Sequence, residues 1–257
     1  MIQILGCGVV GVLAGNRLVE RGLRVNGVRR TPEATAGNRF PIIAGDISEA
    51  ALYKRLEPPS AVLFAANPGL RHGRDNRLAA AAQLITKHWP MARLVYTGST
   101  AVYADHAGAG CDEQAAVAES DPAVAGLLAI ERAVQDHGDA LVLRATALIG
   151  PTRTNALDRL RRGETTVKGD PDRPFSYVHE ADLAELCVRA LLGRLGRGIL
   201  NAAAPERLTL RGYYRLLAHR AGITAEITGD GSAVPSRWID ARRLQALVSD
   251  LDWRRPL

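Results

Sequence analysis

Residues 2–11 read Ile-Gln-Ile-Leu-Gly-Cys-Gly-Val-Val-Gly, a short apolar run that opens into the pattern Gly-x-Gly-x-x-Gly. This spacing is typical of a strand that turns into a helix. The first glycine permits the tight turn, the second lets backbone N–H groups approach a pyrophosphate, and the third lets the helix pack on the sheet. The N-terminus of the helix then faces the anion. The residues expected to line this nucleotide site are Gly6, Gly8, Val9, Val10 and Gly11.

Apolar runs and amphipathic runs alternate through the first 150 residues. We predict further strands at 23–28, 41–46, 61–66, 93–98 and 141–144. Predicted helices occupy 12–21, 48–56, 76–89 and 122–137, with Ser48 as the N-cap of the second, and Pro32 stops the strand at 23–28. Strands that are rich in Val, Ile and Leu on both faces indicate a parallel sheet covered by helices. The fold class is therefore α/β with a doubly wound sheet.

The regular alternation weakens after the Gly-Pro pair at 150–151. We predict a mobile loop at 104–120, short helices and turns after residue 150, a return strand around 199–201 and a helix at 210–221. This pattern divides the chain into a dinucleotide-binding domain of residues 1–150, with a return segment at about 176–200, and a small C-terminal substrate-binding lobe from 151–175 and 201–257.

Composition excludes several classes of protein. The 257 residues carry a net charge of +6, but the basic residues are scattered and form no block with interleaved aromatic residues, so nucleic-acid binding is not expected. No apolar run approaches the roughly 20 residues that span a bilayer, and the first run is too short for a signal peptide. Cys7, Cys111 and Cys187 are too far apart for a zinc site or a disulfide framework, so no metal is expected. We expect a cytoplasmic protein, a monomer or homodimer, that acts on a small molecule.

The end of the second predicted strand indicates which nicotinamide dinucleotide binds. Proteins that prefer NAD place an acidic residue here, about 20 residues after the glycines, to accept a hydrogen bond from the ribose 2′-hydroxyl. This chain has Arg29 and Arg30 instead. Guanidinium groups bind a 2′-phosphate through paired, charge-assisted hydrogen bonds, whereas a carboxylate repels it. The sequence therefore predicts NADP as the cofactor, with NAD as an alternative. The alternative interpretation is that Arg29 and Arg30 are simply solvated surface residues of an arginine-rich chain and bind no cofactor.

Several further blocks resemble the extended short-chain dehydrogenase/reductases, the NAD(P)-dependent epimerase/dehydratase-like family. Their order and spacing cover most of the chain; the blocks are the glycine turn and residues 45–47, 63–68, 96–103, 143–151 and 175–183. The resemblance implies a Rossmann-type lobe that binds NAD(P) and a small C-terminal substrate lobe. It also implies cofactor contacts, with Asp46 near the adenine ring, from Asp46, Ile47, Ala65, Ala66, Asn67 and Thr97.

The resemblance also implies a catalytic set that this chain only partly contains. Ser99 matches the family's Ser/Thr that hydrogen-bonds a substrate hydroxyl or carbonyl group. The family's Tyr-x-x-x-Lys pair is missing, because no tyrosine here has a lysine four residues later. Alignment of residues 128–131 places Ala123 and Leu127 at the two positions. The chain thus resembles an atypical branch of the family, in which another group must move the proton. The candidates are Tyr103, His179 or an acid at 105–120. The resemblance favours packing for Tyr103 and a structural turn for His179 over a role as general acid, and Tyr103 is retained with Ser99 as catalytic.

Two functions follow from these residues. The first is an NADP-dependent oxidoreductase or epimerase/dehydratase-like enzyme acting on a small carbonyl, alcohol or nucleotide-sugar-like substrate. The second is a non-catalytic NADP(H)-binding sensor or regulatory protein, which the missing pair favours.

Overall fold

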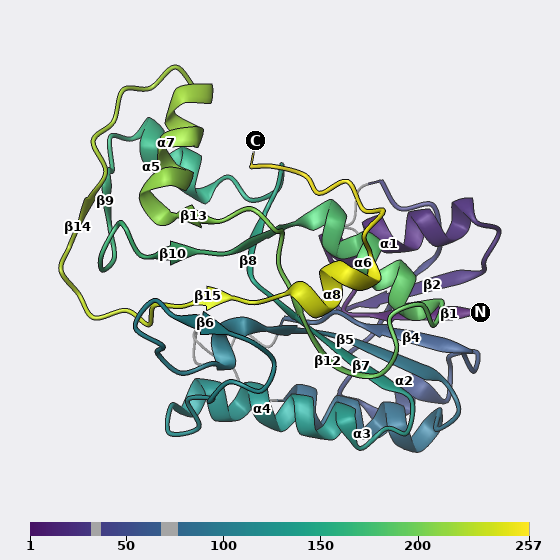
Figure 1. The fold of residues 1–257 in the computed structure, drawn as a ribbon. Helices are drawn as coiled ribbons and strands as arrows, with labels where there is room; N and C mark the ends of the chain where they lie inside the picture. Colours follow the sequence, from purple (N-terminus) through teal and green to yellow (C-terminus); the bar gives the residue numbers. More distant parts are fainter. Residues whose placement is uncertain (32–36, 68–76, 257) are drawn as a thin grey trace.

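A sheet of seven parallel strands forms the centre of the computed structural model, which describes residues 1–31, 37–67 and 77–256 (Figure 1). The strand order is β12-β7-β5-β4-β1-β2-β3, so the direction of winding reverses between β1 and β4. This confirms the predicted α/β, Rossmann-type doubly wound sheet. Pro32, Pro68 and Asn76, which the sequence analysis used, lie outside the described ranges. The strands are β1 (Ile2–Leu5), β2 (Val25–Arg29), β3 (Ile42–Ala44), β4 (Ala61–Phe64), β5 (Arg93–Ser99), β7 (Ala140–Ala145) and β12 (Gly198–Ala202).

The two central strands explain why the glycine turn sits where it does. Every residue of β1 and of β4 is buried, as expected for strands covered on both faces. The chain leaves β1 at Gly6, whose φ is +78°. A Cβ there would lie 2.5 Å from the Cα of Ala66, which follows β4. Only glycine fits this position, because both the backbone conformation and the neighbouring strand exclude a side chain.

Helices cover both faces of the sheet (Figure 1). On one face lie α1 (Val9–Glu20), α6 (Glu180–Leu191) and α8 (Arg242–Leu247). The opposite face carries α2 (Ala50–Tyr53), α3 (Arg77–His88) and α4 (Pro122–Gln135). Each layer forms its own apolar core against the sheet.

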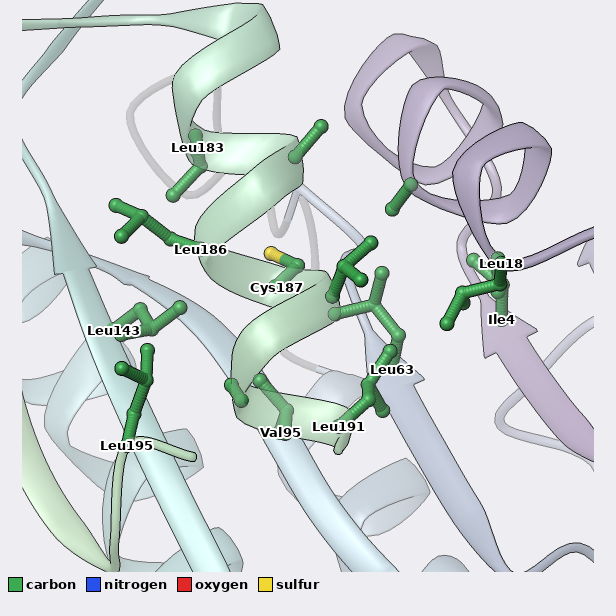
Figure 2. Packing of buried hydrophobic residues seen from close by; sticks show 14 of the residues in the cluster. Ile4, Leu18, Leu63, Val95, Leu143, Leu183, Leu186, Cys187, Leu191 and Leu195 are labelled. Carbon is green, nitrogen blue, oxygen red and sulfur yellow. The ribbon is translucent and has the colours of Figure 1, made fainter. Parts of the chain in front are cut away.

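Helix α6 is the main element that the sequence analysis missed. Short helices and turns were predicted after residue 150, whereas α6 is a single helix of 12 residues. Figure 2 shows its side chains, including Leu183, Leu186 and Cys187, packed between α1 and the strands. Two of its acidic residues, Glu180 and Asp182, are buried, so the polar residues in its sequence do not all mark an exposed face.

The N-cap predicted for the second helix is also wrong. Ser48 does not cap α2, which begins after Glu49 without any side-chain cap. Ser48 instead donates its backbone N–H and its hydroxyl to the Oδ1 of Asp46, at 2.9 and 2.7 Å. Asp46 thus forms a local side-chain turn with Ser48, and this turn uses the Ser48 hydroxyl that would otherwise cap the short helix.

The C-terminal part of the chain builds a separate apolar cluster beside the sheet (Figure 1). The division into a domain and a lobe stays a prediction, but one boundary needs correction: α8, assigned to the lobe, packs Leu244 and Val248 into the core of the main sheet. The predicted loop at 104–120 contains one short strand, β6, which pairs with β15. The elements outside the main sheet are η3 (Thr100–Val102), β6 (Gly110–Cys111), β8 (Ala147–Ile149), α5 (Asn155–Arg161), β9 (Thr166–Val167), β10 (Pro174–Phe175), β11 (Tyr177–His179), β13 (Leu208–Thr209), α7 (Leu210–Arg220), β14 (Thr228–Gly229) and β15 (Trp238–Ile239).

Candidate functional site

Two adjoining cavities open where the winding of the sheet reverses, at the carboxyl ends of β1 and β4. The first has a volume of about 780 Å³ and the second about 530 Å³. Both are lined by Gly6, Gly8, Ala66 and Asn67, so they form one continuous cleft. Open α/β sheets bind ligands at this kind of position.

The N-terminus of α1 opens onto this cleft. Its N-cap, Gly8, provides no side chain to bond the first N–H groups of the helix, and Val9, Val10 and Gly11 line the second cavity. Uncapped N–H groups and the helix dipole together attract an anion. The structure thus brings together all five residues predicted from the glycine pattern.

The three glycines of the turn, Gly6, Gly8 and Gly11, are required for different reasons. A Cβ at Gly11 would lie 2.9 Å from Cγ2 of Ile4, so packing of α1 on the sheet excludes a larger residue. A Cβ at Gly8 would meet only the carbonyl oxygen of Gly6, at 4.0 Å. Nothing among the described residues therefore excludes a side chain at Gly8, and the space that they leave in front of it can take a ligand.

The first cavity has a basic wall. Arg29 and Arg30 line it from the end of β2, and Arg77 lines it from the start of α3. Asp46 and Ile47 also line it, after β3. Hydrogen bonds from Ser48, together with the charges of Arg30 and Arg77, hold the pKa of the Asp46 carboxyl below its usual range.

The second cavity is largely uncharged. Thr97 and Ser99 line it from the end of β5, and Ala65 lines it after β4. The Oγ of Ser99 accepts a hydrogen bond of 3.1 Å from the N–H of Ala101. Among the described residues that line this cavity, Arg153 is the only one with a charged side chain.

Ala123 and Leu127 line the second cavity from α4. These are the two positions at which the family resemblance implies a tyrosine and a lysine. Neither a methyl group nor an isobutyl group can exchange a proton, so these positions give the cavity apolar surface only. Tyr96 also lines this cavity, and its burial, followed by the charge of Glu131, raises the pKa of its hydroxyl.

Tyr103 lies outside both cavities, contrary to the catalytic role considered for it. Its side chain is buried, and its hydroxyl donates a 2.7 Å hydrogen bond to Oδ1 of Asn201. The guanidinium of Arg144 covers its ring at 4.8 Å. Burial raises the pKa of this hydroxyl to about 12. Tyr103 therefore serves packing between the loop after β5 and strand β12.

The acids at 105–120 do not reach the second cavity either. Asp105 accepts hydrogen bonds from the backbone N–H groups of Ala107 and Ser236. Glu113 accepts from the N–H of Asn201, and Glu119 pairs with an arginine on the exposed side of α4. These carboxylates hold the loop in place.

His179 caps α6, which is the structural role considered for it. Its Nδ1 accepts a 3.1 Å hydrogen bond from the N–H of Ala181. Burial lowers the pKa of its imidazole below 6.5. Below pH 6.5 the unfolded chain thus binds a proton that the folded protein does not, and stability is lost as the pH falls toward the folded pKa.

Replacing His179 with asparagine should remove this pH dependence while keeping the helix cap, because asparagine is a good N-cap that does not titrate. We expect the loss of unfolding free energy between about pH 7.5 and about pH 5.5 to be smaller in the variant than in the wild type. Urea denaturation followed by circular dichroism at the two pH values measures this. An equal loss in both proteins would exclude His179 as the titrating group.

Cys7, within the glycine turn, is a buried core residue. Burial raises the pKa of its thiol to about 12, so it is not a reactive thiolate. Cys111 and Cys187 are also buried and unpaired. Within residues 1–31, 37–67 and 77–256, no three His, Cys, Asp or Glu residues are grouped as metal ligands would be.

Some residues of the cleft were not predicted from the sequence. Arg77 starts α3, and its approach to the first cavity depends on how α3 packs rather than on any local pattern. Thr146 and Leu183 line the second cavity from separate parts of the chain. No helix in the described part of the chain has both the length and the apolar composition needed to cross a membrane.

No protein-family model and no curated protein matches this sequence. Solved structures do match its fold. MoeE5 in complex with UDP-glucuronic acid and NAD is 21% identical, with a TM-score of 0.80 over 99% of this chain and 94% of that chain. The Bordetella bronchiseptica enzyme WbmH in complex with NAD+ is 20% identical, with a TM-score of 0.80 over 99% of this chain and 93% of that chain. UDP-glucuronic acid 4-epimerase from Bacillus cereus in complex with NAD is 17% identical, with a TM-score of 0.79 over 100% of this chain and 93% of that chain. At these identities the likeness establishes the fold alone.

Proposed function

We propose that the protein is an NADP-dependent oxidoreductase or epimerase/dehydratase-like enzyme that acts on a small carbonyl, alcohol or nucleotide-sugar-like substrate. The basic wall of the first cavity is the observation that carries this proposal. Arg29, Arg30 and Arg77 approach one cavity beside a glycine turn, and no residue of β2 through Thr31 is a carboxylate that a ribose 2′-hydroxyl could donate to. Nucleotide-sugar and NAD complexes among the solved structures with this fold support the same kind of chemistry.

The residues of the cleft fit a dinucleotide. The open space before Gly8 and the uncapped N-terminus of α1 would take the pyrophosphate. Asp46 and Ile47 would lie beside the adenosine, and Ala65, Ala66, Asn67 and Thr97 would line the path toward the nicotinamide. When bound, NADP supplies hydride transfer at its nicotinamide ring. The small C-terminal lobe would cover the substrate.

Ser99 is the residue proposed to hold the substrate. Its hydroxyl lies at the carboxyl end of β5 and lines the second cavity. The Oγ already accepts from the backbone of Ala101, so its own hydrogen is available to donate to a substrate oxygen. A hydroxyl in this place orients a carbonyl or hydroxyl group and stabilises charge on its oxygen.

Replacing Arg30 with glutamine tests the cofactor assignment. One charge-assisted hydrogen bond is worth about 1.5–3 kcal/mol, so NADPH affinity should fall by roughly 10- to 100-fold while NADH affinity stays unchanged. The same holds for Arg29. Fluorescence titration of both cofactors measures the effect. The matched control is Arg24→Gln, an exposed arginine that precedes β2 and pairs with Glu57. An equal loss for NADPH and NADH would contradict the assignment.

The second candidate is a non-catalytic NADP(H) sensor, which the apolar Ala123 and Leu127 favour. Consumption of NADPH with carbonyl compounds and nucleotide sugars separates the two functions. For the enzyme, we expect turnover that falls at least about 100-fold in Ser99→Ala, as is typical when a donor to a developing oxyanion is removed. Tight NADPH binding without turnover for any substrate would assign the sensor.

A further inference from the structure

The loop between β8 and α5 carries the charged side chain of the second cavity. This loop comprises residues 150–154, and Arg153 within it lines the same cavity as the N-terminus of α1. The other described residues around this space are small, apolar or neutral. Arg153 is exposed to solvent, and its guanidinium supplies the charge of a cavity lining that is otherwise neutral among the described residues, so it favours an anionic group there.

A buried carboxylate holds this loop. Glu180 is 3% exposed and is the first residue of α6. Its Oε2 accepts a 2.6 Å hydrogen bond from the hydroxyl of Thr152, and its Oε1 accepts one of 3.4 Å from the Thr152 N–H. A buried carboxylate is costly, and here the bonds from the loop and the helix N-terminus both offset that cost.

Gly150 completes the attachment. Its φ is +143°, and a Cβ there would lie 2.6 Å from Cγ of Glu180. The carbonyl of Gly150 also accepts a 2.9 Å hydrogen bond from the N–H of Arg153. The loop therefore contacts Glu180 twice before it reaches Arg153, first at Gly150 and then at Thr152.

Several contacts hold the start of α6, to which the loop is attached. His179 caps α6, and the buried Asp182 pairs with Arg254 from the C-terminal segment. β8, which precedes the loop, pairs with β11, which precedes α6. Both ends of the attachment therefore belong to the same small unit, so the position of Glu180 fixes that of Thr152.

We infer that Glu180 is a positioning residue: through Thr152 it sets Arg153 at the second cavity, where the guanidinium selects a substrate bearing a carboxylate or phosphate group. This inference rests on the proposed function and deepens it by naming the charge class of the substrate. Arg153 binds the anion, and Glu180 acts only through the loop.

Isothermal titration of the NADPH-saturated protein with malonate, inorganic phosphate and malonamide tests the inference. Malonate and malonamide have nearly the same size but differ in charge, and comparing malonate with phosphate identifies the preferred anion. We expect at least one of the two anions to bind and malonamide not to bind. The preliminary NADPH titration separates the two levels: failure to bind NADPH refutes the proposed function, whereas NADPH binding without anion binding refutes only this inference.

Variants then separate positioning from a general structural role. Arg153→Gln should weaken anion binding about 10- to 100-fold, and Glu180→Gln and Thr152→Val about 2- to 10-fold, all with unchanged NADPH affinity. Thr152→Ser keeps the hydroxyl and should restore wild-type anion binding. Arg161→Gln, an exposed arginine on α5, is the matched control. Wild-type anion affinity in Arg153→Gln, or in both Glu180→Gln and Thr152→Val, would overturn the inference.

Discussion

Replacing Glu131 with glutamine should lower the free energy of unfolding by about 3–5 kcal/mol, because it leaves a buried guanidinium without a counter-charge. Glu131 on α4 and Arg144 on β7 have side chains that are 4% and 5% exposed. Arg144 donates from Nη2 to Oε2 at 2.7 Å and from Nε to both carboxylate oxygens at 3.1 and 3.2 Å. Its Nη1 already has no hydrogen-bond partner among the described residues. Urea denaturation measures the loss.

An exposed ion pair at the same helix is the control. Glu119 pairs with Arg132 at 2.7 Å, but both side chains are more than 60% exposed, at 63% and 65%. Glu119→Gln should therefore change stability by no more than about 1 kcal/mol. Replacing both Glu131 and Arg144 with methionine should recover part of the loss, because no unpaired charge then remains buried. A loss below about 1 kcal/mol in Glu131→Gln alone would show that the pair is not essential to stability.

Replacing Gly8 with alanine should lower NADPH affinity by roughly 100-fold or more without reducing the stability of the fold. The added methyl group meets no non-neighbouring atom of the described residues closer than 4.0 Å, so it costs no packing there. It does occupy the space in which a pyrophosphate would approach the N–H groups at the start of α1. Fluorescence titration with NADPH and urea denaturation of the same preparation measure the two effects.

Gly138→Ala is the matched control for this substitution. Gly138 follows α4, and a Cβ there would meet nothing within 4 Å. The control should keep wild-type NADPH affinity and stability. Gly6 is unsuitable as a control, because its positive φ and its contact with Ala66 make any substitution destabilising. If Gly8→Ala binds NADPH as tightly as the control, the cleft does not hold a pyrophosphate at this point.

The sheet and the glycine turn could be predicted because their signals are local. β1, β4 and β5 are short apolar runs between turn residues, and the glycine spacing requires only a few consecutive residues. Helix α6 could not be recognised in the same way, because tertiary packing buries two of its acidic residues, Glu180 and Asp182, so the polar positions in its sequence do not mark the exposed face.

Some polar residues of the cleft are likewise placed by local signals, and others only by tertiary packing. Ser99 and Arg29 directly follow predicted strands, so their place at the carboxyl edge followed from the parallel sheet. Arg77 and the Glu180–Thr152 contact depend on tertiary packing between distant segments. Tyr103 shows the opposite case, since its position near Ser99 in the sequence suggested a shared site, whereas its side chain turns toward β12.

The position of α6 also sets the order in which a nascent chain can mature. Side chains of β1, β4 and β5 on one face of the sheet are covered by a helix that ends at Leu191 (Figure 2). Until that residue has left the ribosome, the part of this apolar face that α6 covers has no partner, even though α1 and the strands were synthesised much earlier. Such an intermediate is the stage at which a chain aggregates or binds chaperones most readily. Cellular yield should therefore depend more on how fast α6 docks than on how readily the glycine turn forms.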